Sequence, residues 1–321
     1  MSVFVILEVR NGKITRSSWE AAAAASMLAT GAPVTAVLLG ANTEALAAEA
    51  ASDPFARVVR VEHPLLAAYS SDGYVSALNQ LLQKEGPAQV VLPHTYQVRD
   101  FAPRLATRFG QVLISDVVAL EPGPKFVRQL FQGRMNGIYQ PSGSGPCFIS
   151  VQAGAFRATA SSPGDVAAIE IFAPELASSD IRTTAGEPFR AASQTVDLSS
   201  AQLIVGVGRG IKDAANLPLV QGLATALGAE LAASRPICDA GWLAIERQVG
   251  SSGQTVAPRL YLAVGISGAI QHLVGIKGSQ CVVAINKDPH APILEIADYA
   301  IVGDLFEVVP ALTDAIKAAR Q

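Results

Sequence analysis

The sequence has few cysteines, few charged residues and no long apolar run, and each shortage narrows the class of protein. Its three cysteines, Cys147, Cys238 and Cys281, lie far apart and form no CxxC pair. That spacing argues against a disulfide framework or a zinc site and favours a reducing cytoplasm. Glycine, proline or a charged residue interrupts every apolar run before it reaches the ~18 residues of a membrane-spanning helix. We therefore expect no membrane span.

Charge excludes two further classes. The formal net charge is −3, and the sequence has neither a basic stripe for nucleic acid nor an acidic tail. The N-terminus begins directly as a strand, without a basic segment and a small-residue cleavage site. We therefore expect no signal or transit peptide, a cytoplasmic and prokaryotic protein, and no nucleic-acid partner.

The length and the first part of the chain indicate two α/β domains. The chain has 321 residues, half of them apolar, which suffices for two domains of ordinary size. Strands are expected at residues 2–9, 33–39, 57–61, 89–93 and 112–118, and helices at 17–30, 42–51, 72–84 and 97–109. Strands that alternate with helices of this length predict βαβ crossovers and a doubly wound, mainly parallel sheet.

The pattern changes between Glu121 and Pro174, where helical periodicity disappears. Short strands are expected at residues 126–131, 137–139, 147–152 and 168–172. We interpret them as an antiparallel extension that completes the first domain. Residues 175–196 are rich in Ser, Thr and Ala and form the expected linker. The predicted domains are thus residues 1–192, for docking a partner, and residues 193–321, for binding a cofactor.

The alternation resumes at Leu203 and predicts a second doubly wound sheet. Strands are expected at residues 203–207, 229–233, 260–264, 281–285 and 299–302, and helices at 216–227, after the loop that begins at Gly265, and at 309–319. Ligands of such sheets bind beyond the carboxyl ends of the strands. Small or polar clusters follow nearly every strand of this half, so the predicted site lies here.

Two glycine loops suggest a dinucleotide. Gly206-x-Gly208-x-Gly210 allows a tight turn after a buried strand, and its amides could face an anion. It is not the full GxGxxG fingerprint, and a plain strand-to-helix turn is an equal alternative. The second loop begins at Gly265 and contains Ser267, placed as an N-cap, and Gly268. Neighbouring loops of this kind fit a pyrophosphate spread across both.

Charged residues in these loops have two interpretations each. Arg209 is not needed for the turn, so it is either a cofactor contact or a solvated surface arginine. Arg235 follows Ser234 at another strand end, where a structural ion pair is as reasonable. His272 is expected on the first turns of a helix and on the side of the site, although a lone histidine is more often a satisfied polar residue. His94 stays open.

From Leu203 onward the chain resembles the α subunit of electron transfer flavoproteins. The runs that carry the resemblance are GVGRGI (206–211), ASRPICDAGW (233–242), QVG (248–250), YLAVGISGAIQH (261–272), AINKDPHAPI (284–293) and ADYAIVGD (297–304). The N-terminal half matches in length and in βα layout. The resemblance implies one FAD in the C-terminal domain and a partner β subunit that carries AMP.

The resemblance also implies roles for individual residues. Arg209 is expected over the isoalloxazine edge, Ser234 and the Ser267 and Gly268 amides at the pyrophosphate, and Gln271 and His272 at the flavin and ribityl region. Asn286, Asp304 and Leu305 are expected at the adenosine end. The complete expected set is Arg209, Ser234, Arg235, Val249, Gly250, Ser251, Ser252, Gly265, Ser267, Gly268, Ala269, Ile270, Gln271, His272, Asn286, Asp304 and Leu305.

One segment departs from the family pattern. The family has Gln-(Thr/Ser)-Gly after Val-Gly, whereas here Ser251, Ser252 and Gly253 follow Gly250. Ser252 can still offer the hydroxyl expected near the flavin N5. Ser251 replaces the glutamine and its amide.

The function that follows is a soluble electron carrier rather than an enzyme. It would take electrons from flavin dehydrogenases such as the acyl-CoA dehydrogenases of fatty acid oxidation. It would pass them to the membrane electron transfer flavoprotein–quinone oxidoreductase. The guanidinium of Arg209 and an imidazolium at His272 would favour the negatively charged reduced flavin.

Two alternatives remain. A relative in electron bifurcation or nitrogen fixation would share the FAD domain, and a second FAD in its partner would identify it. A nicotinamide-dependent dehydrogenase or a non-redox nucleotide-binding module is disfavoured by the missing GxGxxG and the missing acidic residue at a ribose-binding strand end.

Overall fold

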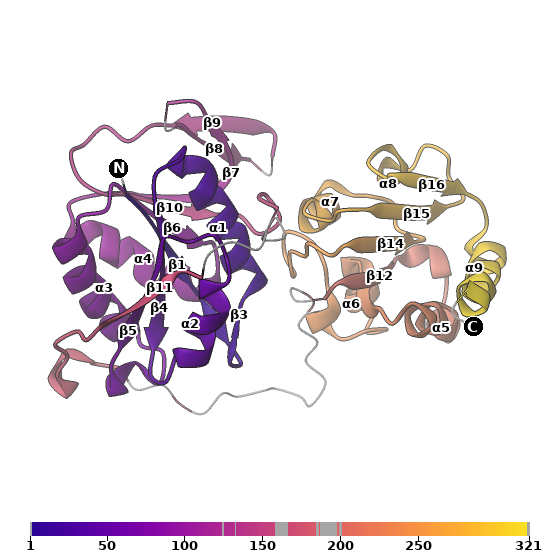
Figure 1. Cartoon of the computed structure of the whole chain (residues 1–321). Coiled ribbons are helices and arrows are strands. Elements are labelled where there is room, and N and C mark those ends of the chain that lie inside the picture. Colours follow the sequence, from indigo (N-terminus) through magenta and orange to yellow (C-terminus); the bar gives the residue numbers. More distant parts are fainter. Residues whose placement is uncertain are drawn as a thin grey trace. The chain divides into compact units, whose positions relative to one another are not determined.

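The computed structural model describes residues 2–123, 125–131, 133–157, 166–183, 186, 198 and 201–319. The chain divides into two compact units, Met1–Pro188 and Phe189–Gln321, which are described separately (Figure 1). The predicted boundary after residue 192 and more than half of the predicted linker lie outside the described residues. That boundary stays a prediction.

The first unit contains a nine-stranded sheet in the order β11-β5-β4-β1-β6-β10-β7-β8-β9. Its parallel part includes β1 (Val3–Leu7), β4 (Val34–Gly40), β5 (Arg57–Glu62), β6 (Gln89–Pro93) and the first residues of β7 (Leu113–Glu121). Strands β2 (Val9–Arg10) and β3 (Lys13–Ile14) form a separate small hairpin. The parallel sheet predicted from the alternation of strands and helices is confirmed.

The expected antiparallel extension is only half correct. Strands β8 (Lys125–Leu130) and β9 (Met135–Tyr139) do extend β7 antiparallel. However, β10 (Cys147–Val151) lies parallel between β6 and β7, and β11 (Ala168–Phe172) lies parallel at the edge beside β5. All five residues of β10 are buried, as is typical of a strand covered on both faces of a parallel sheet.

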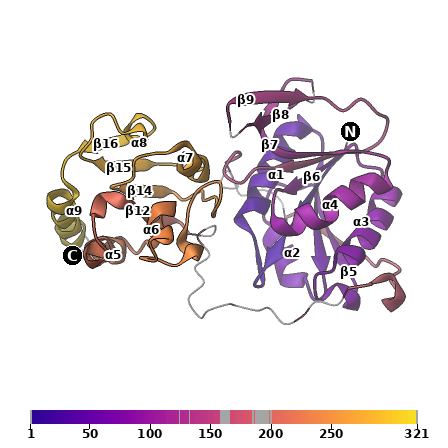
Figure 2. The same cartoon turned by 180° about the vertical axis from the view of Figure 1, so that it is seen from behind.

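Helices cover both faces of this sheet. Helices α1 (Arg16–Ala29) and α2 (Glu44–Ala51) lie on one face, and α3 (Ser71–Glu85) and α4 (Tyr96–Arg108) lie on the other (Figure 2). The first pair contributes buried alanines to one core, and the second pair contributes larger apolar side chains to the other. The small alanine side chains let α1 lie close to β1. Thr15 caps α1 by accepting a hydrogen bond from the Ser18 amide, which fixes its start.

The second unit is a five-stranded parallel sheet in the order β13-β12-β14-β15-β16. Its strands are β12 (Leu203–Val207), β13 (Glu230–Ala233), β14 (Leu260–Val264), β15 (Val282–Asn286) and β16 (Tyr299–Val302). All five predicted strands of this half are confirmed to within one residue. The chain steps from β12 to β13 on one side and then to β14 on the other, so the strand order reverses between β12 and β14.

Helices again lie on both faces. One core includes side chains from α5 (Leu217–Leu227), α6 (Arg235–Asp239) and α9 (Leu305–Ala319), and the other includes α7 (Ile270–Ile276) and α8 (Pro292–Glu295). Helix α9 begins four residues before the predicted start at Val309. Asp304 ends the preceding loop and accepts a hydrogen bond from the Phe306 amide (2.9 Å), which allows the earlier start.

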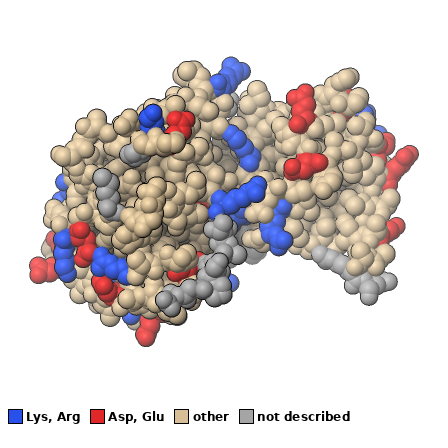
Figure 3. Space-filling view, turned by 45° about the horizontal axis from the view of Figure 1, so that its top comes forward, with Lys and Arg blue, Asp and Glu red and all other residues tan. Residues whose placement is uncertain are grey.

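The surface carries few charged side chains, as expected from the few charged residues of the sequence. Figure 3 shows a face dominated by uncharged side chains, on which basic and acidic residues occur singly or in small groups. In the described ranges, no helix is both long enough and apolar enough to cross a membrane.

Candidate functional site

The candidate site is the carboxyl edge of the second sheet, where the strand order reverses. The loops that leave β12 and β14 at this point are the two glycine loops of the sequence. They lie side by side: the Gly208 amide donates to the Val264 carbonyl (2.9 Å) and the Gly210 amide donates to the Gly265 carbonyl (3.0 Å). A crevice of this kind is where open α/β sheets bind ligands.

The glycines of the first loop permit this close contact. A Cβ atom at Gly208 would lie 2.3 Å from the Gly265 carbonyl oxygen, and one at Gly210 would lie 2.6 Å from the Gly265 Cα. The expectation that the amides of this loop face an anion therefore fails for Gly208 and Gly210, because both amides already bind the neighbouring loop. These glycines serve the approach of two backbones.

The second loop supplies the free amides instead. Within the described part of the chain, the amides of Ser267, Gly268 and Ala269 donate no hydrogen bond. They precede α7, whose N-cap residue is Ala269 and whose start has no side-chain cap. The N-cap expected at Ser267 is thus wrong, because the Ser267 carbonyl instead accepts from the Ile293 amide (3.2 Å). Free amides at this place suit an anion.

Gly268 holds this loop in its conformation. Its φ is +86°, and an added Cβ would lie 2.2 Å from the Ile293 nitrogen. Both the dihedral angle and the contact exclude other residues here. The loop is therefore fixed against α8 before any ligand binds.

Two arginines follow strand ends, and they differ in whether an acidic side chain pairs with them. Arg209 is exposed in the first glycine loop, and no acidic side chain of the described residues pairs with it. Arg235 instead forms an exposed ion pair with Asp239 (3.1 Å), the structural alternative considered from the sequence. Ser234 caps the five-residue α6 without a side-chain hydrogen bond to it, and its amide donates to the Val207 carbonyl (2.9 Å).

The segment that differs from the family pattern, residues 250–253, lies against α7. The Ser251 amide donates to the Gln271 carbonyl (2.8 Å), and an added Cβ at Gly250 would lie 2.9 Å from the same oxygen. The Ser252 hydroxyl accepts a hydrogen bond from the buried Gln248 side chain (3.0 Å). The structure therefore brings the expected residues 249–252 together with Gln271 and His272.

His272 differs from its expected state. Its ring is buried, and Nε2 lies 3.0 Å from the Tyr261 hydroxyl. Burial lowers the pKa of His272 to about 4, and the nearby Val249 carbonyl only partly opposes this by favouring the protonated ring. In the cofactor-free chain desolvation therefore favours the neutral ring at neutral pH, in contrast to the imidazolium expected beside the flavin.

The residues expected at the adenosine end have structural contacts of their own. The Asn286 amide group donates to the Ile266 carbonyl (2.8 Å), and its oxygen accepts from the Asp288 amide (3.0 Å). Asp304 caps α9, and the Leu305 side chain is buried in the core. Three further residues of the expected set are exposed at the start of α7: Ala269, Ile270 and Gln271.

Tyr261 was not singled out from the sequence. It is a fully buried residue of β14 whose hydroxyl contacts His272. A tyrosine in an otherwise apolar buried strand was the available signal, because a buried hydroxyl needs a partner.

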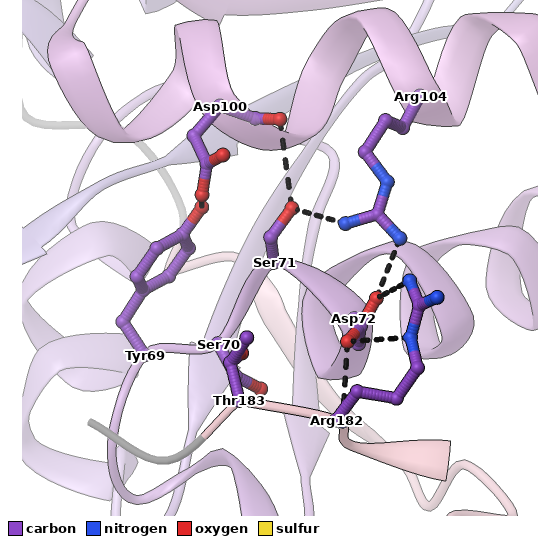
Figure 4. Close-up of a pocket in the computed structure, with 8 residues that line it drawn as sticks. All are labelled: Tyr69, Ser70, Ser71, Asp72, Asp100, Arg104, Arg182 and Thr183. Carbon is purple, nitrogen blue, oxygen red and sulfur yellow. Dashed lines mark hydrogen bonds and ion pairs between the residues drawn. The ribbon is translucent and has the colours of Figure 1, made fainter.

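A hollow in the first unit has a different character (Figure 4). Asp72 accepts hydrogen bonds from Arg104 (2.5 Å) and Arg182 (3.0 Å), and Tyr69 donates to Asp100 (2.6 Å). The two arginines hold the pKa of Asp72 far below its usual range. Since both arginines already bind the one carboxylate of Asp72, we interpret the cluster as an ion-pair network rather than a ligand site.

Comparison with known proteins covers both units. The model of the electron transfer flavoprotein domain matches residues 3–177, and that of the electron transfer flavoprotein FAD-binding domain matches residues 197–277. The second match contains both glycine loops and α7.

Curated relatives match nearly the whole chain. An electron transfer flavoprotein subunit alpha from Bacillus subtilis (strain 168) is 37% identical over 319 residues, covering 98% of this chain and 97% of the relative. A subunit of the same name from Mycobacterium leprae (strain TN) is 42% identical over 77% of this chain and 76% of its own. The electron transfer subunit beta of an acryloyl-CoA reductase from Anaerotignum propionicum is 32% identical over 99% of this chain and 96% of the relative. This chain belongs to the family of electron transfer flavoprotein alpha subunits, which carry electrons rather than convert a substrate.

Proposed function

We propose that this chain binds FAD at the carboxyl edge of β12, β14 and β15 and is the large subunit of a two-subunit electron carrier. The observation that supports this most is the second glycine loop, with three free amides at the start of α7 beside the exposed Arg209 loop. The family model of an FAD-binding domain covers the same residues.

The residues fit a dinucleotide. Free amides and a guanidinium make this edge positive, as a pyrophosphate requires. The glycines at 208, 210 and 265 let the two loops pack backbone against backbone, which holds the second loop in place. We propose that Ser234, Ser267 and Gly268 hold the pyrophosphate. Asn286, Asp304 and the Leu305 backbone would lie at the adenosine end.

The flavin end would lie at the junction of residues 249–252 with α7. Bound FAD would supply the reversible electron transfer, and the chain would set its potential and access. Arg209 would attract the negative charge of the reduced flavin. Ser251, Ser252, Gln271 and the neutral His272 would offer hydrogen bonds there.

The partners proposed are those of the family resemblance. A β subunit carrying AMP would complete the carrier, flavin dehydrogenases such as acyl-CoA dehydrogenases would donate electrons, and electron transfer flavoprotein–quinone oxidoreductase would accept them. The proposed location is the cytoplasm, and the described cysteines are all unpaired, as suits a reducing compartment.

A second candidate is an alpha subunit that serves a reductase or an electron-bifurcating complex. The name of the Anaerotignum propionicum relative favours it, because that protein is an electron transfer subunit of a reductase. The nucleotide in the co-purified partner subunit distinguishes the two: AMP supports the shuttle and a second FAD supports bifurcation.

A pair of glycine variants tests the FAD site. Gly268→Ala should shift the free amides, and we expect FAD affinity to fall at least about tenfold, or about 1.4 kcal/mol. Gly222→Ala on the exposed face of α5 is the control, because an added Cβ there meets no atom within 4 Å. Its affinity should not change. Binding is measured by titrating cofactor-free protein with FAD, alongside the free energy of unfolding. A folded Gly268→Ala protein with unchanged affinity would contradict the proposed site.

A further inference from the structure

Tyr261 and His272 form a buried polar pair beneath the candidate site. Tyr261 lies on β14 with none of its surface exposed, and His272 lies on α7. The hydroxyl is 3.0 Å from Nε2, and the two rings meet edge to face with centroids 5.9 Å apart. The pair links the central strand of the sheet to the helix that follows the second glycine loop.

The first glycine of the GVGRG run makes room for this hydroxyl. A Cβ atom at Gly206 would lie 2.1 Å from the Tyr261 oxygen, far inside van der Waals contact. Gly206 sits within β12, beside Ala263 of β14. Tyr261 therefore requires a glycine at position 206, whereas the adjacent loop at Gly265 requires glycines at positions 208 and 210.

The burial of the hydroxyl determines the direction of the hydrogen bond. Burial raises the pKa of Tyr261, so the hydroxyl keeps its proton. A buried O–H needs an acceptor, and among the described residues Nε2 of His272 is the polar atom within reach. Nε2 therefore accepts and carries no proton. In a neutral imidazole the proton must then lie on Nδ1.

Nδ1 is left without a regular partner. It is buried and makes no hydrogen bond within the described part of the chain. The Val249 carbonyl is near enough to favour a protonated ring but is not placed for a regular hydrogen bond. A buried N–H whose nearest acceptor is poorly placed stays partly unsatisfied, which is costly unless a ligand accepts its hydrogen bond.

We propose that Tyr261 is a positioning residue, which holds His272 in the neutral tautomer protonated at Nδ1 and thereby presents that N–H to the cofactor. The second part rests on the proposed function. His272 would then act on the flavin as a neutral hydrogen-bond donor and not as a cation.

The first test is the tautomer in cofactor-free protein. Nitrogen NMR of the histidine-labelled full chain with its partner subunit distinguishes protonated from unprotonated ring nitrogens, and substitution of the other three histidines assigns His272. We expect a protonated Nδ1 and an unprotonated Nε2. In Tyr261→Phe, which keeps the ring and removes the hydroxyl, we expect a mixture of tautomers. A protonated Nε2 in the wild type, or an unchanged tautomer in the variant, would overturn the proposal.

The second test concerns the cofactor. Tyr261→Phe should weaken FAD binding on the order of tenfold and change the flavin absorption spectrum, because the donor is no longer fixed. Tyr299→Phe, at an exposed position of β16, is the matched control and should leave both unchanged. An altered tautomer with unchanged FAD affinity and spectrum would overturn the role at the cofactor. A wild-type protein that takes up no FAD would contradict the proposed function, and the tautomer measurement would still decide the positioning.

Discussion

At the residue scale, Arg209 places a permanent positive charge in the loop that follows β12. Arginine side chains are permanently charged, and no acidic side chain of the described residues forms an ion pair with Arg209. In the proposed site the free amides of the neighbouring loop, and not Arg209, hold the pyrophosphate. We therefore expect Arg209 to influence the redox potential of FAD more than its affinity.

Arg209→Ala tests this division of roles. The variant should lower the first reduction potential of FAD by tens of millivolts, on a scale of about 59 mV for each tenfold change. Arg209→Lys should recover only part of the shift, because a point charge lacks the planar fork of a guanidinium. Arg235→Ala, whose exposed arginine pairs with Asp239, is the control. Redox titration with parallel measurement of FAD content decides, and an unchanged potential with loss of the cofactor would make Arg209 an anchor.

His272 makes the stability of the cofactor-free chain depend on pH. Its pKa is about 4 in the folded chain and about 6.5 in an unfolded one, so between these values the unfolded state binds more protons. The free energy of unfolding should therefore decrease as the pH falls from about 6.5 to 4, by up to about 1.4 kcal/mol per pH unit.

Urea unfolding at several pH values measures this dependence. The slope should be smaller in His272→Gln, whereas His290→Gln, at an exposed position, should keep the wild-type slope. Equal slopes in all three proteins would show that His272 is not a buried neutral ring. The sequence pointed to His272 but could not show its burial, because that depends on how α7 packs back against Tyr261 of the preceding strand.

At the scale of elements, the sequence predicted the second sheet better than the edges of the first. The bounds of β12, β14 and β16 agree to the residue, since glycine or a polar residue ends each apolar run. The prediction that β10 and β11 are antiparallel is wrong. Their connections lack a predicted helix, and only tertiary pairing places β10 between β6 and β7.

The segment after β11 is held to the first unit by the network in Figure 4, and its stability contribution can be measured. Asp72→Asn removes the charge that Arg104 and Arg182 share. We expect a loss of about 1 kcal/mol in the free energy of unfolding, a modest value because both arginines are partly exposed.

A control variant and a pH dependence test whether the loss of stability comes from this network. Asp239→Asn removes an exposed pair on α6 and should change the stability by less than about 0.5 kcal/mol. The pKa of Asp72 is lowered in the folded chain, so its contribution to the free energy of unfolding should persist above about pH 4. That contribution should be lost only as the pH falls below this value. Equal stability of Asp72→Asn and the wild type at pH 7 would refute the anchoring role.

At the scale of the whole molecule, we propose separate roles for the two units. All of the residues expected at the cofactor lie in the second unit, and the first unit would dock the β subunit. Light scattering of the co-expressed chains should therefore show one copy of each subunit. A flavin-loaded chain that transfers electrons as a monomer would contradict that assembly.

The claim that this chain carries FAD has a direct test in the absorption spectrum of the purified two-subunit protein, recorded before and during titration with dithionite. We predict an oxidised flavin spectrum, bleached reversibly by dithionite, and one FAD released per chain on denaturation. A well-folded complex that stays colourless after incubation with FAD would contradict the account.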